Sequence, residues 1–184
     1  VTFHPDPEIF QVTTVYKYDT LAARLRELAY LNKGIHLSLT DKRTLVPDVD
    51  ENGNELETKH YRSDVFYSKE GLKEFVEYLD GGAEKLIESP IYLETDKIIP
   101  IEIALQYNTS YTEKIYSYVN NINTIEGGTH LQGFKMGLTR TLKNYADKAG
   151  MLAKLKFDLA ADDFREGLTA VVSVKVAEPQ FEGQ

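Results

Sequence analysis

The stretch "NNINTIEGGTHLQGFKMGLTR", residues Asn120 to Arg140, joins a β-rich segment to a helical one through a pair of glycines. Gly127 and Gly128 can adopt backbone angles that other residues avoid, so the chain can change direction sharply here. Thr129, with Gln132 three residues later, has the pattern of a capping box, which marks the start of a helix. The glycines and the cap therefore predict a tight turn from strand to helix, with no ligand needed to explain them.

A long amphipathic helix is predicted behind this turn, from about His130 to Ala149. Its apolar residues are spaced three or four apart, as on one helix face: Leu131, Phe134, Leu138, Leu142, Tyr145 and Ala149. Four cations lie outside this stripe, against a single acid, Asp147: Lys135, Arg140, Lys143 and Lys148. A segregated basic face could contact nucleic-acid phosphates, or it could simply keep an exposed helix soluble.

The elements around this helix predict an α+β fold. Four segments are rich in Ile, Val and Tyr and read as strands: 91–95, 98–108, 112–123 and 168–176. Two further helices are predicted at 19–33 and 68–80, each followed by a glycine stop signal. We expect a two-layer α/β sandwich in which a mixed sheet of about four strands has its helices on one face, and in which the first three strands are antiparallel neighbours.

The acidic segment 44–70 is predicted to be a surface hairpin. Asn52 and Gly53 stand between two strand-like runs, which favours a type I′ turn. Asp48 and Asp50 also match the start of a calcium loop, but Lys59 stands where that loop needs a glutamate. The hairpin is therefore the preferred interpretation, and no metal site is predicted.

Composition limits the possible function classes. The 184 residues fit one domain and carry a formal net charge of -8, so any nucleic-acid contact must come from a local basic patch. The absence of cysteine excludes thiol chemistry and suits a reducing cytoplasm. No apolar run reaches the length of a membrane-spanning helix, so no membrane partner is expected. Both ends look cut from a longer polypeptide.

Catalytic motifs are not apparent. The sequence has no P-loop and no nucleophile elbow, and its four histidines stand in unrelated contexts. Asp162, Asp163 and Glu166 could form an acid pair or a magnesium site, but they open a helical turn, where carboxylates are favoured as caps. We therefore predict no catalytic residue and no bound cofactor.

The motif "YVNNINTIEGGTHLQGF" resembles the B subunits of bacterial DNA gyrases. The stretches "FHPDPEIF", "YDTLAARLRELAYLNKGIHLSLTDKR" and "REGLTAVVSVKVAEPQFEGQ" share the resemblance, which spans nearly the whole chain. It implies that residues 1–10 end an ATP-binding domain and that 11–184 form the transducer domain, with 44–70 as an insertion. The implied fold is that of the second domain of a small-subunit ribosomal protein, with an unusual left-handed β-α-β crossover.

The resemblance also implies a mechanical role. In the family the transducer relays ATP binding and hydrolysis in the preceding domain to movement of the DNA gate and strand passage during negative supercoiling. Lys135 matches a basic residue that lines the DNA cavity, and Arg140 is added from its charge alone. Gln184 matches the first residue of a loop that reaches the ATP γ-phosphate, and the lysine of that loop lies beyond this sequence.

The partners implied are DNA, the gyrase A subunit and a second B subunit. ATP and Mg²⁺ are expected in the parent protein, a type II topoisomerase, and the isolated chain is expected to be inactive. Two alternatives stay open: the B subunit of topoisomerase IV, which has the same architecture, and a non-enzymatic module of the same fold that binds nucleic acid or protein.

Overall fold

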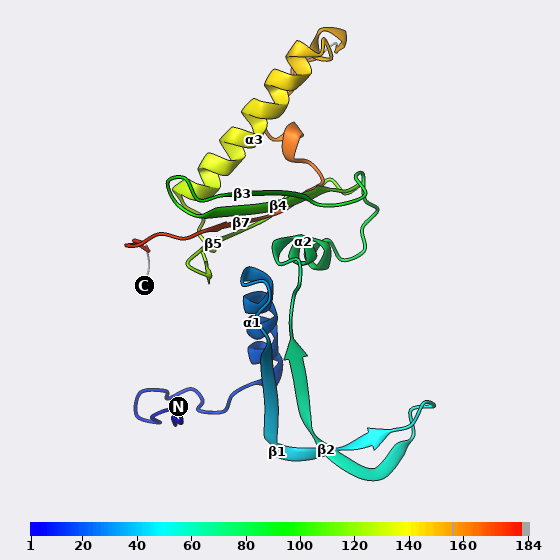
Figure 1. Ribbon diagram of the computed structural model, residues 1–184, viewed down its shortest axis with the longest axis vertical. Helices are drawn as coiled ribbons and strands as arrows, with labels where there is room; N and C mark the ends of the chain where they lie inside the picture. Colours follow the sequence, from blue (N-terminus) through cyan, green and yellow to red (C-terminus); the bar gives the residue numbers. More distant parts are fainter. Residues whose placement is uncertain (156, 182–184) are drawn as a thin grey trace. The chain divides into compact units, whose positions relative to one another are not determined.

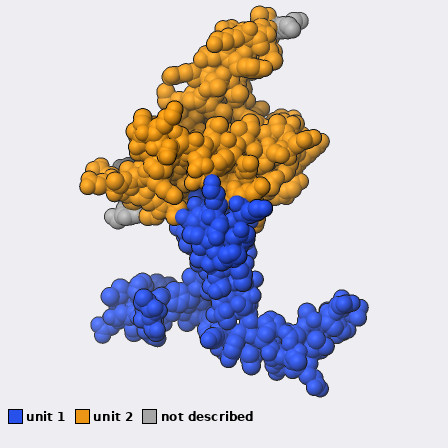
Figure 2. Space-filling model, in the orientation of Figure 1, with its two compact units in different colours: residues 1–69 blue, residues 70–184 orange. Residues whose placement is uncertain are grey.

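The computed structural model describes residues 1–155 and 157–181. The chain divides into two compact units, Val1–Lys69 and Glu70–Gln184 (Figure 2). Each unit contains its own sheet, and the second holds the predicted long helix.

The first unit combines one helix with a long hairpin (Figure 1). Helix α1 spans Tyr18–Leu31, and strands β1 (Leu37–Val49) and β2 (Glu55–Phe66) pair in antiparallel fashion. A small core joins helix and hairpin: Tyr18, Ala22, Ala29 and Phe66, with Leu25, Leu37 and Leu39 packed against them. Only the base of the hairpin contributes to this core, because every residue of β2 before Phe66 is exposed.

The hairpin differs from the prediction in extent and in turn type. Its strands begin at Leu37 and end at Phe66, so the hairpin starts before the predicted segment 44–70. The turn has one residue of positive φ, Gly53 at 84°, whereas a type I′ turn needs two. Asp50 closes the turn instead: its carbonyl accepts from the Gly53 N–H at 3.0 Å, and its Oδ1 accepts from the Asn52 and Asn54 N–H groups at 2.8 Å.

The second unit contains a five-stranded mixed sheet in the order β3-β4-β7-β5-β6. The strands are β3 (Ile91–Thr95), β4 (Ile101–Tyr107), β5 (Lys114–Val119), β6 (Ile122–Asn123) and β7 (Leu168–Val174). The four predicted strands are present, but the third, 112–123, is broken by a turn at Asn120 and Asn121 into β5 and the short β6. The predicted neighbours are partly wrong, because β7 lies between β4 and β5, antiparallel to the first and parallel to the second.

Helices α2 (Leu72–Asp80) and α3 (Thr129–Lys148) lie on opposite faces of this sheet (Figure 1). Phe134 and Leu138 of α3 pack against Leu168 and Ala170, whereas the α2 residue Asp80 accepts a hydrogen bond from Thr169, which points to the other face. The prediction of two layers with helices on one face is therefore wrong. The reason lies in β7, whose seven residues are all buried and whose sequence "LTAVVSV" lacks the alternation of a one-sided strand.

Two connections determine how the sheet is built around α3. β5 and β7 are parallel neighbours, and the chain passes from one to the other through α3, so the three elements form a β-α-β crossover. That this crossover is left-handed stays a prediction. β5 and β6 are joined by a two-residue turn in which Asn120 and Asn121 have φ of 50° and 67°, the type I′ pattern. The Asn120 side chain also pairs with Val176, donating to its carbonyl and accepting from its N–H at 2.8 Å each.

Candidate nucleic-acid interface

The glycine pair shapes the entry to α3. Gly127 and Gly128 have φ of 81° and 151°, and a Cβ on Gly128 would lie 2.9 Å from the His130 ring. Gly128 is the N-cap residue and Thr129 already belongs to the helix, with no side-chain hydrogen bond at the cap. The predicted capping box is therefore wrong, and the Gln132 N–H bonds to the Gly128 carbonyl at 3.1 Å as in an ordinary first turn.

His130 ties the start of α3 to the sheet. Its Nε2 lies 3.0 Å from Oγ1 of Thr124, which also donates to the Ser117 carbonyl of β5 at 2.9 Å. Partial burial lowers the pKa of His130 below its usual 6.5. The contact with Thr124 and the direction of the pKa shift both favour a neutral imidazole at this position.

This lowered pKa predicts a loss of stability in mild acid. Because the unfolded chain takes up the proton at about pH 6.5 and the folded chain only at lower pH, the contribution of His130 is complete above pH 6.5 and falls as the pH drops toward the folded-state value. We expect the free energy of unfolding to decrease between pH 7.5 and pH 5.5, and to decrease less in His130→Gln. Chemical denaturation at both pH values measures this, and an equal decrease in the variant would contradict it.

The cations of α3 do not share one direction. Arg140, Lys143 and Lys148 are exposed, whereas Lys135 is partly buried next to Phe134, which packs on the sheet. At 3.6 residues per turn, Lys135 and Arg140 lie about 140° apart around the helix. The four cations therefore spread around the helix and do not form the predicted segregated basic face, and Lys135 and Arg140 point in different directions.

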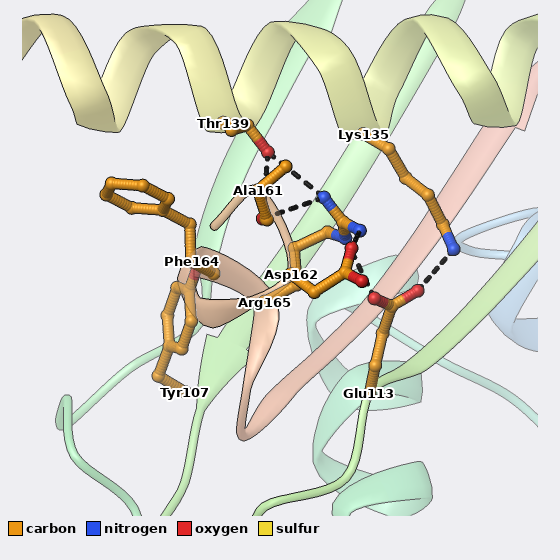
Figure 3. Close-up of polar contacts among 8 residues, drawn as sticks. All are labelled: Tyr107, Glu113, Lys135, Thr139, Ala161, Asp162, Phe164 and Arg165. Atoms are coloured by element: carbon orange, nitrogen blue, oxygen red, sulfur yellow. Dashed lines mark hydrogen bonds and ion pairs between the residues drawn. The ribbon is translucent and has the colours of Figure 1, made fainter. Parts of the chain in front are cut away.

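Lys135 takes part in a charged cluster (Figure 3), formed by Glu113, Lys135, Asp162 and Arg165. The Lys135 ammonium pairs with Oε1 of Glu113, just before β5, and the Arg165 Nε–H donates to Oε2 of the same carboxylate at 2.8 Å. Arg165 also pairs with Asp162. Each oxygen of Glu113 therefore has one basic partner.

Arg165 is the anchor of this charged cluster. Its side chain is 10% exposed, against 33% for Lys135 and 29% for Glu113. One guanidinium nitrogen, Nη1, donates to Oγ1 of Thr139 at 3.1 Å and to the Ala161 carbonyl at 3.0 Å (Figure 3). These bonds join α3 to the turn Asp163–Arg165, which Tyr107 of β4 holds through a 2.6 Å hydrogen bond from its hydroxyl to the Phe164 carbonyl.

The charges of the cluster stabilise one another. Partial burial raises the pKa of Glu113, but hydrogen bonds from Lys135 and Arg165 and their positive charges outweigh burial, so that pKa lies below its usual 4.5. Burial lowers the pKa of Arg165, and the carboxylates of Glu113 and Asp162 raise it above its usual value. Two cations and two anions give the cluster no net charge while Lys135 stays in place.

Sequence reasoning found Lys135 but missed its partners. Glu113 and Arg165 are 22 and 30 residues away along the chain, and no local spacing connects them with Lys135. Asp162 is the N-cap residue of the turn Asp163–Arg165, as predicted, but its side chain makes no cap hydrogen bond and pairs with Arg165 instead. Oδ2 of Asp163 accepts from the Ala160 N–H at 2.7 Å. Gln184, the predicted ATP-loop residue, lies outside the described residues.

The described residues carry neither a metal-ligand cluster nor a membrane-spanning helix. Within residues 1–155 and 157–181, no group of three or more His, Asp or Glu side chains is placed to hold a metal ion. In the same ranges, no helix combines the length and the apolar character needed to cross a membrane.

Known proteins similar to this chain are DNA gyrase B subunits. The chain is 59% identical to the subunit from Cytophaga aurantiaca and 52% identical to that from Clostridium acetobutylicum, in both cases over its whole length. It spans 36% and 26% of the length of these two proteins.

Solved structures of domains from gyrase B and from topoisomerase IV are also similar to the chain. The 43K ATPase domain of Thermus thermophilus gyrase B, in complex with an aminocoumarin, matches 97% of the chain with a TM-score of 0.77 and 37% identity, and the chain covers 44% of it. The topoisomerase IV ATP-binding domain of Francisella tularensis shares the fold, with a TM-score of 0.65 at 22% identity over 94% of the chain and 42% of that domain. The family model for DNA gyrase B matches residues 71–184, which include α3 and the charged cluster. The chain belongs to the DNA gyrase B family.

Proposed function

We propose that the chain is the transducer domain of a DNA gyrase B subunit. In this role it relays ATP binding and hydrolysis in the preceding domain to DNA gate movement and strand passage during ATP-dependent negative supercoiling. The observation that carries the proposal is the family match over residues 71–184, which covers the whole α3 crossover and its exposed cations. The resemblance adds the ribosomal-protein second-domain fold and the left-handed crossover, which are part of the proposal.

The ATP site belongs, on this proposal, to the rest of the parent protein. The matching Thermus structure is an ATPase domain of which the chain covers 44%. Within the described residues, no group of three or more His, Asp or Glu side chains is placed to hold the Mg²⁺ that accompanies ATP. Residues 1–10 would end the ATP-binding domain, 11–184 would form the transducer, and Gln184 would open the loop that reaches the γ-phosphate.

The isolated chain should therefore not hydrolyse ATP. We expect a purified protein of residues 1–184 to release phosphate from ATP at the rate of a buffer blank, because the groups that bind and activate the nucleotide lie elsewhere in the parent. A coupled phosphate-release assay, with the full-length subunit as positive control, measures this. Turnover by the isolated chain above the blank would contradict the proposed division of labour.

DNA is the proposed partner of α3, with Lys135 as the principal contact and Arg140 as a second contact that faces another direction. Ammonium and guanidinium groups bind phosphates sequence-independently, which suits a protein part that must hold any duplex segment. The gyrase A subunit and a second B subunit are the proposed protein partners, and the bacterial cytoplasm is the proposed location.

Two alternatives are separated by one experiment. A topoisomerase IV subunit shares the fold, but relatives that are 45% and 60% identical to the chain are gyrase B subunits. The full-length protein, assembled with its A subunit and ATP, should introduce negative supercoils into relaxed plasmid DNA. Decatenation without supercoiling would favour topoisomerase IV, and absence of both activities would favour a non-enzymatic module of the same fold.

A further inference from the structure

We propose that Glu113 is a counter-ion that DNA must displace from Lys135, so that Glu113 sets how much DNA is needed to stimulate the enzyme. This proposal rests on the DNA contact of Lys135 proposed above. It adds a residue that need not touch DNA and acts through the lysine.

The geometry allows Lys135 to leave while Glu113 stays. Glu113 is held through Oε2 by Arg165 at 2.8 Å, and Arg165 is itself fixed by Thr139 and Ala161. Lys135 binds the other oxygen, Oε1, and its side chain is 33% exposed against 10% for Arg165, so Lys135 is the more accessible of the two cations. A phosphate oxygen can therefore replace Oε1 as the partner of Lys135 without breaking the contact between Glu113 and Arg165.

Charge opposes this exchange. With Lys135 in place, two cations balance the carboxylates of Glu113 and Asp162. Once Lys135 turns to a phosphate, Arg165 alone faces both carboxylates, and the cluster carries one net negative charge close to the bound DNA. DNA phosphates must overcome both the lost ion pair and this repulsion. Removing the charge of Glu113 should therefore let a lower concentration of DNA stimulate ATP turnover.

The test uses the full-length subunit assembled with its A subunit, and a linear duplex as the DNA probe. The readout is the DNA concentration that gives half-maximal stimulation of ATP turnover. Glu113→Gln should lower this concentration about twofold to fivefold, the range expected for a partly exposed ion pair. The glutamine carbonyl can still accept from the Arg165 Nε–H, and a melting temperature close to that of the wild type would confirm that the cluster remains folded.

Three comparison variants make the result specific. Glu113→Asp keeps the charge and should stay close to the wild type. Glu77→Gln is the matched control, because Glu77 also pairs with a lysine, Lys85 at 2.8 Å, but lies on α2 on the opposite face of the sheet, so no change is expected. In a Lys135→Ala background, Glu113→Gln should have a clearly smaller effect than in the wild type, because the repulsion between Glu113 and DNA remains but there is no ion pair to break.

The outcomes separate the two proposals. If Lys135→Ala weakens the DNA response but Glu113→Gln leaves it unchanged or weakens it too, the counter-ion role is overturned and the DNA contact stands. If Glu113→Gln is equally effective without Lys135, Glu113 acts by another route and the proposal is wrong. If Lys135→Ala leaves the DNA response unchanged, the proposed DNA contact itself fails.

Discussion

Lys135→Glu in the full-length subunit should raise the DNA concentration needed for half-maximal stimulation of ATP turnover by about tenfold or more. The substitution removes the ammonium that would bind a phosphate, and it places a second carboxylate beside Glu113, which already faces the same space. Both changes repel a polyanion. The measurement is ATP turnover as a function of the concentration of linear duplex DNA, at low and at moderate salt.

Lys85→Glu provides a matched control for this experiment. It makes the same charge reversal and also leaves a glutamate beside a former glutamate partner, Glu77, but on the face of the sheet covered by α2. We expect Lys85→Glu to leave the DNA response close to that of the wild type. An equal loss in both variants would mean that net charge, rather than a contact at Lys135, governs the response, and an intact response in Lys135→Glu would remove the residue from the interface.

Gly167→Ala should destabilise the second unit by about 2 to 5 kcal/mol, the sum of a left-handed backbone penalty and a clash in a packed site. Gly167 has φ of +69°, and an added Cβ would lie 2.3 Å from the Asn108 carbonyl oxygen and 2.8 Å from that of Ser110. Asn108 cannot yield easily, because its N–H bonds to the Gly167 carbonyl at 2.9 Å and its side chain donates to the buried Asp80 at 2.6 Å. The measurement is thermal unfolding of the purified chain followed by circular dichroism.

Gly150→Ala separates the two components of this cost. Gly150 has nearly the same backbone angle, φ of +68°, but a Cβ added to it would have no neighbouring atom within 4 Å. This variant should lose only the backbone part, about 1 to 2 kcal/mol. Equal losses in the two variants would show that the contact with Asn108 does not constrain Gly167.

Local patterns in the sequence predicted local structure well. The apolar spacing predicted a helix from about His130 to Ala149, and α3 spans Thr129–Lys148. All four predicted strands exist, because runs of Ile, Val and Tyr between turn residues indicate strands wherever they later pair. Resemblance to the family identified the chain more specifically than any composition or spacing could.

Contacts between residues that are far apart in the sequence could not be predicted from local patterns. Nothing local shows that β7, the last strand in the chain, lies between β4 and β5, or that Asp80 at the end of α2 meets Thr169, 89 residues away. The type I′ turn was expected at Asn52 and found at Asn120 and Asn121, where the two-residue loop requires two positive φ angles. The partners of Lys135 were missed for the same reason, since an ion pair depends on the fold and leaves no spacing in the sequence.

Direct cross-linking would test the central claim, that Lys135 on α3 contacts the DNA that the enzyme transports. A photo-crosslinking residue in place of Lys135, in the full-length subunit assembled with its A subunit, should form a covalent adduct with radiolabelled duplex DNA in the presence of a non-hydrolysable ATP analogue. The same residue in place of Lys85, on the opposite face of the sheet, should not. Adducts at position 85 alone, or at neither position, would contradict the proposed contact.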